Sequence, residues 1–171
     1  MSRLAELLAK YAVMRGDFVL ASGRRSSYYI NIKKAYTRPE VMREIVSEME
    51  KKLRRLQYDY LAGVAVGAVP IVACVALSVN TPFLMVRKEE KGHGTGAKVE
   101  GEWKPGRRVV LLEDVTTTGG SVLSAALALR GEGLICQDVI VVVDREEGAE
   151  ENLRREKLRL LPLLRVSQLL R

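Results

Sequence analysis

The chain has 171 residues, of which 47% are hydrophobic and 29% charged, and this balance is typical of a globular protein with one substantial core. The sequence has no run of about 20 apolar residues that could span a membrane, and its amphipathic N-terminus does not resemble a signal peptide. We therefore expect a single domain over residues 1–171, located in the cytoplasm and without a membrane partner.

The net charge of +7 predicts an anionic partner. Two Phe and one Trp offer few surfaces on which nucleic-acid bases could stack, so we expect a small polyanion and no nucleic acid. Cys74 and Cys136 lie in apolar stretches, which favours free thiols in the core over a disulfide or a metal site.

Hydrophobic periodicity predicts that helices and strands alternate along most of the chain. The helix that begins at Pro39 has proline in its first turn and an apolar stripe formed by Val41, Ile45, Met49 and Leu53. In chain order the sequence predicts a helix over 3–15, a strand-turn-strand over 18–37, a helix over 39–56, a strand, turn and helix over 60–79, a strand over 82–88, a long loop over 88–103, a strand over 107–115, a helix over 120–131, a strand over 138–146 and a short C-terminal segment from 153.

Continuously apolar strands that alternate with helices indicate a mainly parallel sheet covered on both faces. Ligands of such sheets bind at the carboxyl ends of the strands. The chain places its unusual chemistry at four of these ends, in Glu113 and Asp114, in Arg87 and Lys88, in Asp144 and Arg145, and in the segment Gly63–Gly67. This convergence predicts one site at the edge of the sheet.

The segment VVLLEDVTTTGG, residues 109–120, combines two acids with a loop rich in hydroxyl groups and glycine. Such a loop before a helix offers backbone N–H and hydroxyl donors to a phosphate. The acids would repel phosphate, so we expect them to face sugar hydroxyls, a divalent cation or positive charge on a sugar. The segment lacks the lysine of a P-loop and the spacing of a dinucleotide-binding loop. A threonine-capped helix with acids near its N-terminus is the structural alternative.

The same segment with the next residue added, VVLLEDVTTTGGS, resembles the phosphoribosyl diphosphate (PRPP) motif of type I phosphoribosyltransferases. Three other segments, FVLASGRRSSYYINIK, VRKEEKGHGTGAKVEG and VVVDREEGAEENL, resemble orotate phosphoribosyltransferases. The resemblance covers nearly the whole chain. It implies an α/β fold with a central, mainly parallel sheet and a small N-terminal hood of residues 1–35. It also implies transfer of a phosphoribosyl group from PRPP to orotate in UMP synthesis, with Mg²⁺ held mainly through the substrate.

The resemblance also assigns residues to roles. Glu113 and Asp114 would face the ribose, with one of them near the magnesium, and Lys91, His93 and Asp114 would be catalytic. Residues that bind the 5-phosphate would be Val115, Thr116, Thr117, Thr118, Gly119, Gly120 and Ser121, and residues that bind the diphosphate would be Arg87, Lys88, Lys91 and His93.

The charged loop around Lys91 and His93 would close over the diphosphate, and the resemblance implies that part of it enters the partner's site in a homodimer. Its cations, glycines and scarcity of apolar anchors also indicate a mobile lid. A solvated charged loop is the alternative.

For orotate, the resemblance assigns Thr117 and Arg145, because a guanidinium can bind a planar carboxylate in a fork. Arg145 could instead pair with Asp144 or Glu146. Tyr29 and Ile30 would lie beside the orotate ring, whereas we expect Tyr28 in the core.

Two positions depart from the family pattern, because Ala21 and Gly67 stand where many members have lysine.

Three other functions are possible for this sequence: a purine phosphoribosyltransferase, a PRPP-sensing regulator and a nucleotide-binding module without catalysis. Arg145 argues against the first of these.

Overall fold

A computed structural model describes residues 2–19, 23, 25–88 and 98–170. Its elements are α1 (Arg3–Tyr11), β1 (Val13–Val19), β2 (Arg25–Ile30), α2 (Ile32–Tyr36), α3 (Pro39–Leu53), β3 (Tyr60–Val64), α4 (Val69–Ser78), β4 (Phe83–Val86), β5 (Val99–Glu100), β6 (Arg108–Thr116), α5 (Gly120–Gly131), β7 (Ile135–Asp144), α6 (Ala149–Arg155), β8 (Arg159–Arg165) and α7 (Val166–Leu169).

The central sheet has the strand order β5-β4-β3-β6-β7-β8. The pairs β3–β4, β3–β6, β6–β7 and β7–β8 are parallel, and within the described part of this sheet only the short β5 runs antiparallel to its neighbour. The expected α/β fold with a mainly parallel sheet is therefore confirmed. The inner strands β6 and β7 are buried over most of their length, which explains why they read as apolar runs.

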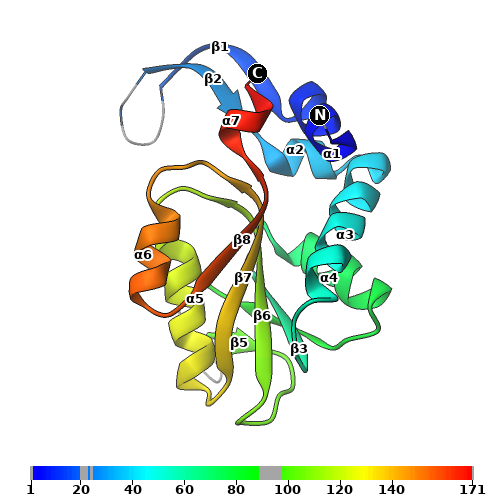
Figure 1. Ribbon diagram of the computed structural model, residues 1–171, viewed down its shortest axis with the longest axis vertical. Coiled ribbons are helices and arrows are strands. Elements are labelled where there is room, and N and C mark those ends of the chain that lie inside the picture. Colours follow the sequence, from blue (N-terminus) through cyan, green and yellow to red (C-terminus); the bar gives the residue numbers. More distant parts are fainter. Residues whose placement is uncertain (1, 20–22, 24, 89–97, 171) are drawn as a thin grey trace.

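Helices cover both faces of this sheet (Figure 1). Alternate residues of β6 point to opposite faces, so Val110 and Leu112 pack with α3 and α4, whereas Val109 and Leu111 pack with α5 and α6. The predicted apolar stripe of α3 is fully buried. Gly63 in β3 allows α4 to approach closely, because a Cβ at that position would lie 2.7 Å from a methyl group of Val72.

The N-terminal elements α1, β1, β2 and α2 lie together at one end of the molecule, beside α7 and the C-terminus (Figure 1). The prediction of a helix over 3–15 was wrong at its C-terminal end, because β1 begins at Val13 and pairs with β2. Residues 32–36 were predicted as strand but form α2. The Asn31 side chain caps this helix by accepting a hydrogen bond from the backbone N–H of Lys34, and such caps favour helix over strand.

The structure also differs at the C-terminus and at one cysteine. The segment after residue 153 contributes the edge strand β8 and the helix α7, neither of which the sequence predicted individually. Cys136 is buried as expected, but Cys74 is exposed on α4, so the prediction of two core thiols was wrong for Cys74. In the part of the chain that the structure describes, every helix is too short or too polar to cross a membrane.

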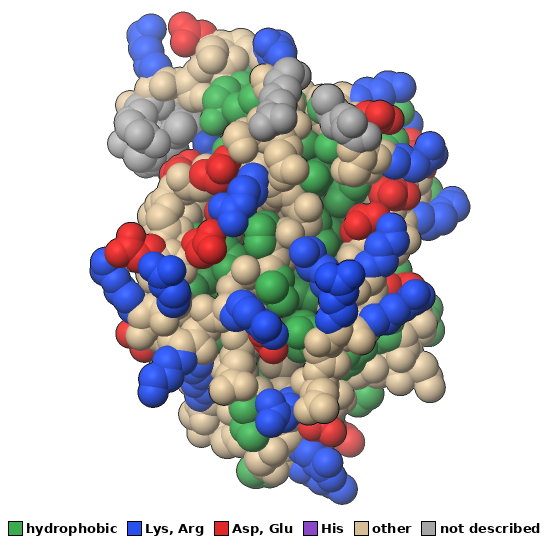
Figure 2. Space-filling view, in the orientation of Figure 1, with side chains coloured by type: hydrophobic (Ala, Val, Ile, Leu, Met, Phe, Trp, Pro, Cys, Tyr) green, Lys and Arg blue, Asp and Glu red, His purple; other side chains and the backbone are tan. Residues whose placement is uncertain are grey.

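The surface is charged over much of its extent. Figure 2 shows Lys and Arg side chains at many places on one face, with Asp and Glu side chains between them. The basic residues on this face are therefore dispersed, and among the described residues no single basic patch marks a binding site there.

Candidate active site

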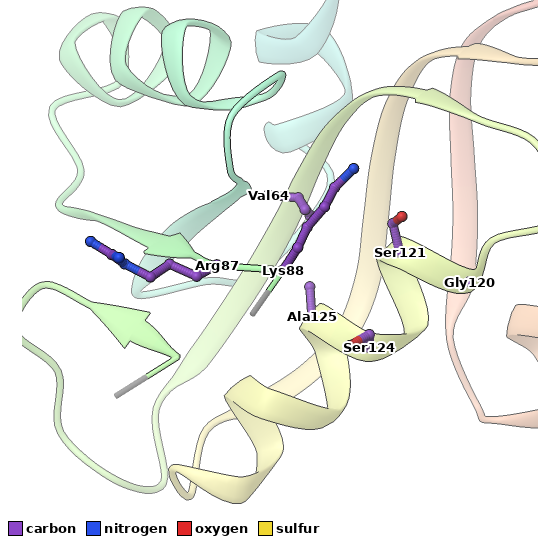
Figure 3. Close-up of a pocket in the computed structure, with 7 residues that line it drawn as sticks. All are labelled: Val64, Arg87, Lys88, Gly120, Ser121, Ser124 and Ala125. Atoms are coloured by element: carbon purple, nitrogen blue, oxygen red, sulfur yellow. The ribbon is translucent and has the colours of Figure 1, made fainter. Parts of the chain in front are cut away.

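A cavity of about 260 Å³ lies at the carboxyl ends of β3 and β6. Its lining comes from the loop after β3, the end of β6, the start of α5 and two lysines, and comprises Lys33, Val64, Ala65, Val66, Gly67, Lys88, Glu113, Asp114, Val115, Thr117 and Ser121. A second cavity of about 250 Å³ shares Val64, Lys88 and Ser121 with the first and extends along α5 (Figure 3). The structure therefore brings three of the four predicted strand ends together.

The two acids of β6 are both buried, with exposed fractions of 5% for Glu113 and 4% for Asp114. The Glu113 carboxyl accepts a hydrogen bond of 3.0 Å from the Asp114 backbone N–H. Burial, followed by the hydrogen bond and the charge of Asp114, raises the pKa of Glu113 to about 9. Glu113 is therefore protonated at neutral pH and can act there as a hydrogen-bond donor as well as an acceptor.

Asp114 is held in a different way. Its Oδ1 accepts a hydrogen bond of 3.0 Å from the Val115 backbone N–H, and its Oδ2 accepts one of 2.9 Å from the Lys33 ammonium. Burial lowers the pKa of Lys33, but the hydrogen bond and charge of Asp114 outweigh it, so the pKa of Lys33 is raised. The hydrogen bond therefore holds a charged lysine against the Asp114 carboxyl in a fixed orientation.

The turn from β6 into α5 presents donors to the cavity. Gly119 caps α5 with a φ of 87°, a conformation that favours glycine, and the side-chain amide of Asn152 donates to the Thr118 carbonyl at 2.9 Å. The first N–H groups of a helix have no partner within it and mark its positive end. Thr117, Thr118, Gly120 and Ser121 are exposed there, so this turn can receive an anion.

Thr116 occupies a different environment from the rest of this predicted phosphate loop. It is the last residue of β6, its exposed fraction is 4%, and its carbonyl accepts a hydrogen bond of 2.9 Å from the Arg145 backbone N–H. Its contribution is thus to join β6 to the end of β7.

The two basic residues after β4 extend in different directions (Figure 3). Lys88 lines both cavities, and its positive charge acts to lower the pKa of Glu113. The Arg87 guanidinium lies 3.1 Å from a carboxylate oxygen of Glu100. Lys91 and His93, together with Ala21, fall outside the described residues.

Arg145 follows β7 and is nearly buried, with a side chain that is 12% exposed. Its Nε lies 3.1 Å from an oxygen of Glu147 but has no partner in hydrogen-bond geometry. The alternative in which Arg145 pairs with Asp144 or Glu146 does not occur in the structure. Asp144 instead forms an ion pair with Arg165, and Glu146 accepts a hydrogen bond from the Ser167 backbone N–H. Arg145 thus keeps a buried N–H group for another acceptor.

The predicted contacts for the orotate ring lie in the hairpin β1–β2. Tyr29 is 40% exposed, with its ring centroid 5.8 Å from that of Phe18. Ile30 is buried in the core, and Tyr28 packs against that core as expected. Neither Tyr29 nor Ile30 lines the two cavities.

Sequence reasoning missed two site residues of α2, Lys33 and Tyr36. The Tyr36 hydroxyl donates a hydrogen bond of 2.9 Å to the Gly67 carbonyl, and Lys33 reaches Asp114 as described above. The available signal was Asn31 as a helix cap, followed by buried residues at the spacing of one helical face in Ile32, Ala35 and Tyr36.

Comparison with known proteins agrees with this geometry. Residues 33–157 match the model of the phosphoribosyl transferase domain family. The orotate phosphoribosyltransferase of Thermococcus kodakarensis is 51% identical over 160 residues, which cover 92% of this chain and 86% of that protein.

Solved structures give the same picture. The orotate phosphoribosyltransferase from Aeropyrum pernix superposes with a TM-score of 0.89 at 40% identity and covers 98% of this chain and 96% of its own. The Mycobacterium tuberculosis orotate phosphoribosyltransferase in complex with PRPP superposes with a TM-score of 0.81 at 30% identity, over 97% of this chain and 96% of its own.

Proposed function

This chain belongs to the phosphoribosyltransferase family, and within it to the orotate phosphoribosyltransferases, and on that premise we propose how its residues carry out the reaction. The enzyme transfers the phosphoribosyl group of PRPP to orotate and forms orotidine 5′-phosphate and diphosphate. The bond from C1 of the ribose to the diphosphate breaks, and a bond from C1 to a ring nitrogen of orotate forms. The observation that carries this assignment is the acid pair followed by the glycine-capped turn, at the end of a central parallel strand.

The turn from Val115 to Ser121 would bind the 5-phosphate through backbone N–H groups and hydroxyls. Asp114, whose two oxygens are oriented by Val115 and Lys33, would accept hydrogen bonds from ribose hydroxyls. The protonated Glu113 lies beside it. These groups are fixed before substrate arrives, so they can stabilise positive charge on the ribose in the transition state without reorganising.

The diphosphate needs cations, and we propose that Lys88 supplies one from the cavity wall. Lys91 and His93 keep the roles that the resemblance implies. Magnesium would help to neutralise the charge of the diphosphate. The described residues contain no group of three metal-binding side chains, and both acids already engage backbone N–H groups. The donor set therefore suits an ion that is held mainly by diphosphate and ribose oxygens.

Orotate would be bound by Thr117, which lines the cavity, and by Arg145. The buried Nε of Arg145 lies 3.1 Å from Glu147 but makes no hydrogen bond with a described residue, and a carboxylate in fork geometry is the acceptor that a guanidinium binds best. This residue also argues against a neutral purine base as the acceptor substrate.

We further propose a homodimer with shared active sites. The sequence of α4 has no charged residue, and its outer face leaves Leu77 85% exposed. A helix that is apolar all round is normally buried, so a second copy would cover this face. The cytoplasmic location stays a prediction from the sequence.

The decisive experiment measures orotate consumption by ultraviolet absorbance with purified protein. We expect consumption only when PRPP and Mg²⁺ are both present, with reactions lacking PRPP or containing EDTA as controls. Turnover of adenine or hypoxanthine without orotate consumption would instead identify a purine phosphoribosyltransferase. Binding of PRPP without any turnover would identify a regulator or a binding module.

A further inference from the structure

The short helix α2 connects the N-terminal hood to the active site through one of its faces. Lys33 and Tyr36 are three residues apart and therefore lie on the same side of the helix. Tyr36 donates to the carbonyl of Gly67, and Lys33 donates to Asp114, each at 2.9 Å. One helix thus holds both the loop after β3 and an acid at the end of β6.

Lys33 is placed to do more than neutralise a buried acid. Its side chain is 55% exposed, whereas that of Asp114 is 5% exposed, so the ammonium lies at the boundary between the buried carboxylate and the open cavity. An ammonium group has three N–H donors, and the bond to Asp114 uses one of them. The others are available to a ligand in the cavity that Lys33 lines.

Gly67 provides the space that this arrangement requires. A Cβ at Gly67 would lie 2.8 Å from Asp114 Oδ2 and 2.9 Å from Lys33 Cε, which is closer than such atoms approach in proteins. The loop Gly63–Gly67 has no cationic side chain of its own. The ammonium from α2 therefore reaches the cavity through the volume that a side chain on this loop would fill.

We propose that Lys33 is a substrate-binding residue, which holds Asp114 toward the ribose with one hydrogen bond and binds the diphosphate of PRPP with another. The inference rests on the proposed function. Its physical basis is the repulsion between a carboxylate and a diphosphate, which is strong in a partly buried site. An ammonium between the two turns this repulsion into two attractive contacts, and it supplies the positive charge that the loop lacks.

The test compares Lys33→Met, which removes the charge and keeps most of the stem, with Lys34→Met. Lys34 is the adjacent, exposed lysine of α2 and does not line the cavity, so it controls for the change in net charge. For Lys33→Met we expect the Kd of PRPP by titration calorimetry, and its KM, to rise about 10-fold to 100-fold, the range for a hydrogen bond to a charged group. Lys34→Met should stay within about twofold of wild type.

A second variant keeps the charge and moves it. In Gly67→Ala the added Cβ would displace Asp114 Oδ2, Lys33 Cε or both, so their contact is lost and the Kd of PRPP should rise in this variant too. In the double variant Lys33→Met/Gly67→Ala, the fold-increase in the Kd of PRPP should be smaller than the product of the two single fold-increases, because both changes remove the same contact. If Lys33→Met does not fold, Gly67→Ala and the charge-retaining Lys33→Arg, which should keep most of the affinity, decide the question.

The outcomes separate this inference from the proposed function. Wild-type protein that neither binds PRPP nor consumes orotate would overturn the proposed function. Wild-type protein that does both, with a Lys33→Met variant that binds PRPP as tightly as Lys34→Met, would overturn only the role of Lys33. A fall in melting temperature of Lys33→Met with unchanged PRPP affinity would give the pair a purely structural role.

Discussion

At the residue scale, Glu113 is a carboxyl that its environment keeps uncharged at neutral pH. Burial and the neighbouring Asp114 raise its pKa to about 9 from the ordinary value of 4.5. The folded protein therefore keeps a proton on Glu113 that the unfolded chain loses above pH 4.5. A state that binds the extra proton is favoured by acid, so the contribution of Glu113 to stability falls as the pH rises from about 4.5 to about 9.

We predict that the ligand-free protein loses stability over this range, by up to about 1.4 kcal/mol per pH unit from this group. Glu113→Gln carries a neutral side chain of similar shape, so its free energy of unfolding should change less between pH 5.5 and 8.5. Urea unfolding of both proteins at several pH values measures the difference. Parallel curves for the two proteins would mean that Glu113 is ionised in the folded state.

At the element scale, predictability from sequence followed the length and the apolar content of each segment. The strands around Leu61 and Leu111 were predictable because inner parallel strands are apolar on both faces. The helix α2 has only five residues, too few for a periodic pattern. The edge strand β8 contains Pro162, a residue that weakens a strand pattern but is tolerated at the edge of a sheet.

The same reasoning applies to the site. The acids and the glycine-rich turn were predictable because they are adjacent in sequence, and local sequence sets their chemistry. The partner of Asp114 could not be predicted, because Lys33 is 81 residues away in the sequence. Only the packing of α2 brings the two side chains together. The glycine at position 67 looked like a missing cation, but its absent side chain leaves room for a lysine from another element.

The role of the turn before α5 in stability and in PRPP binding can be tested by adding one methyl group at Gly119. Gly119→Ala would place a Cβ 3.1 Å from Leu153 Cγ on a residue with a φ of 87°. We expect a loss of about 1–2 kcal/mol in stability, the cost of a left-handed conformation for a residue with a side chain. We also expect a higher KM for PRPP, because the displaced turn positions the phosphate donors.

Gly131→Ala is the matched control at the other end of α5, where an added Cβ meets no atom of the described residues within 4 Å. It should be neutral or stabilising by about 0.5–1 kcal/mol and should leave the KM for PRPP unchanged. Thermal unfolding and initial rates measure both effects. Equal stability of the two variants would show that Gly119 is not required for its conformation.

At the scale of the whole molecule, the exposed apolar face of α4 predicts the oligomeric state. We expect Leu77→Glu to raise the dissociation constant of the dimer by about 30-fold or more, equivalent to about 2 kcal/mol for a central apolar contact. Leu127→Glu makes the same change on α5, where the leucine is 50% exposed, and should leave the dimer intact. Analytical ultracentrifugation over a range of concentrations measures both. A wild-type protein that is monomeric would remove the basis for shared sites.

Shared sites make a quantitative prediction for mixed dimers. Lys91→Ala and Asp114→Asn should each be inactive as homodimers. If Lys91 acts in the partner's site, a mixed dimer carries both defects in one site and leaves the other site intact. Random exchange between equal amounts of the two variants should therefore restore about one quarter of the wild-type activity, because half of the dimers are mixed and half of their sites are intact. If Lys91 acts within its own subunit, every site has one defect and no activity returns. The recovery of activity after subunit exchange, confirmed by mass spectrometry of the intact dimers, distinguishes the two arrangements because Asp114 is fixed in its own subunit by Val115 and Lys33.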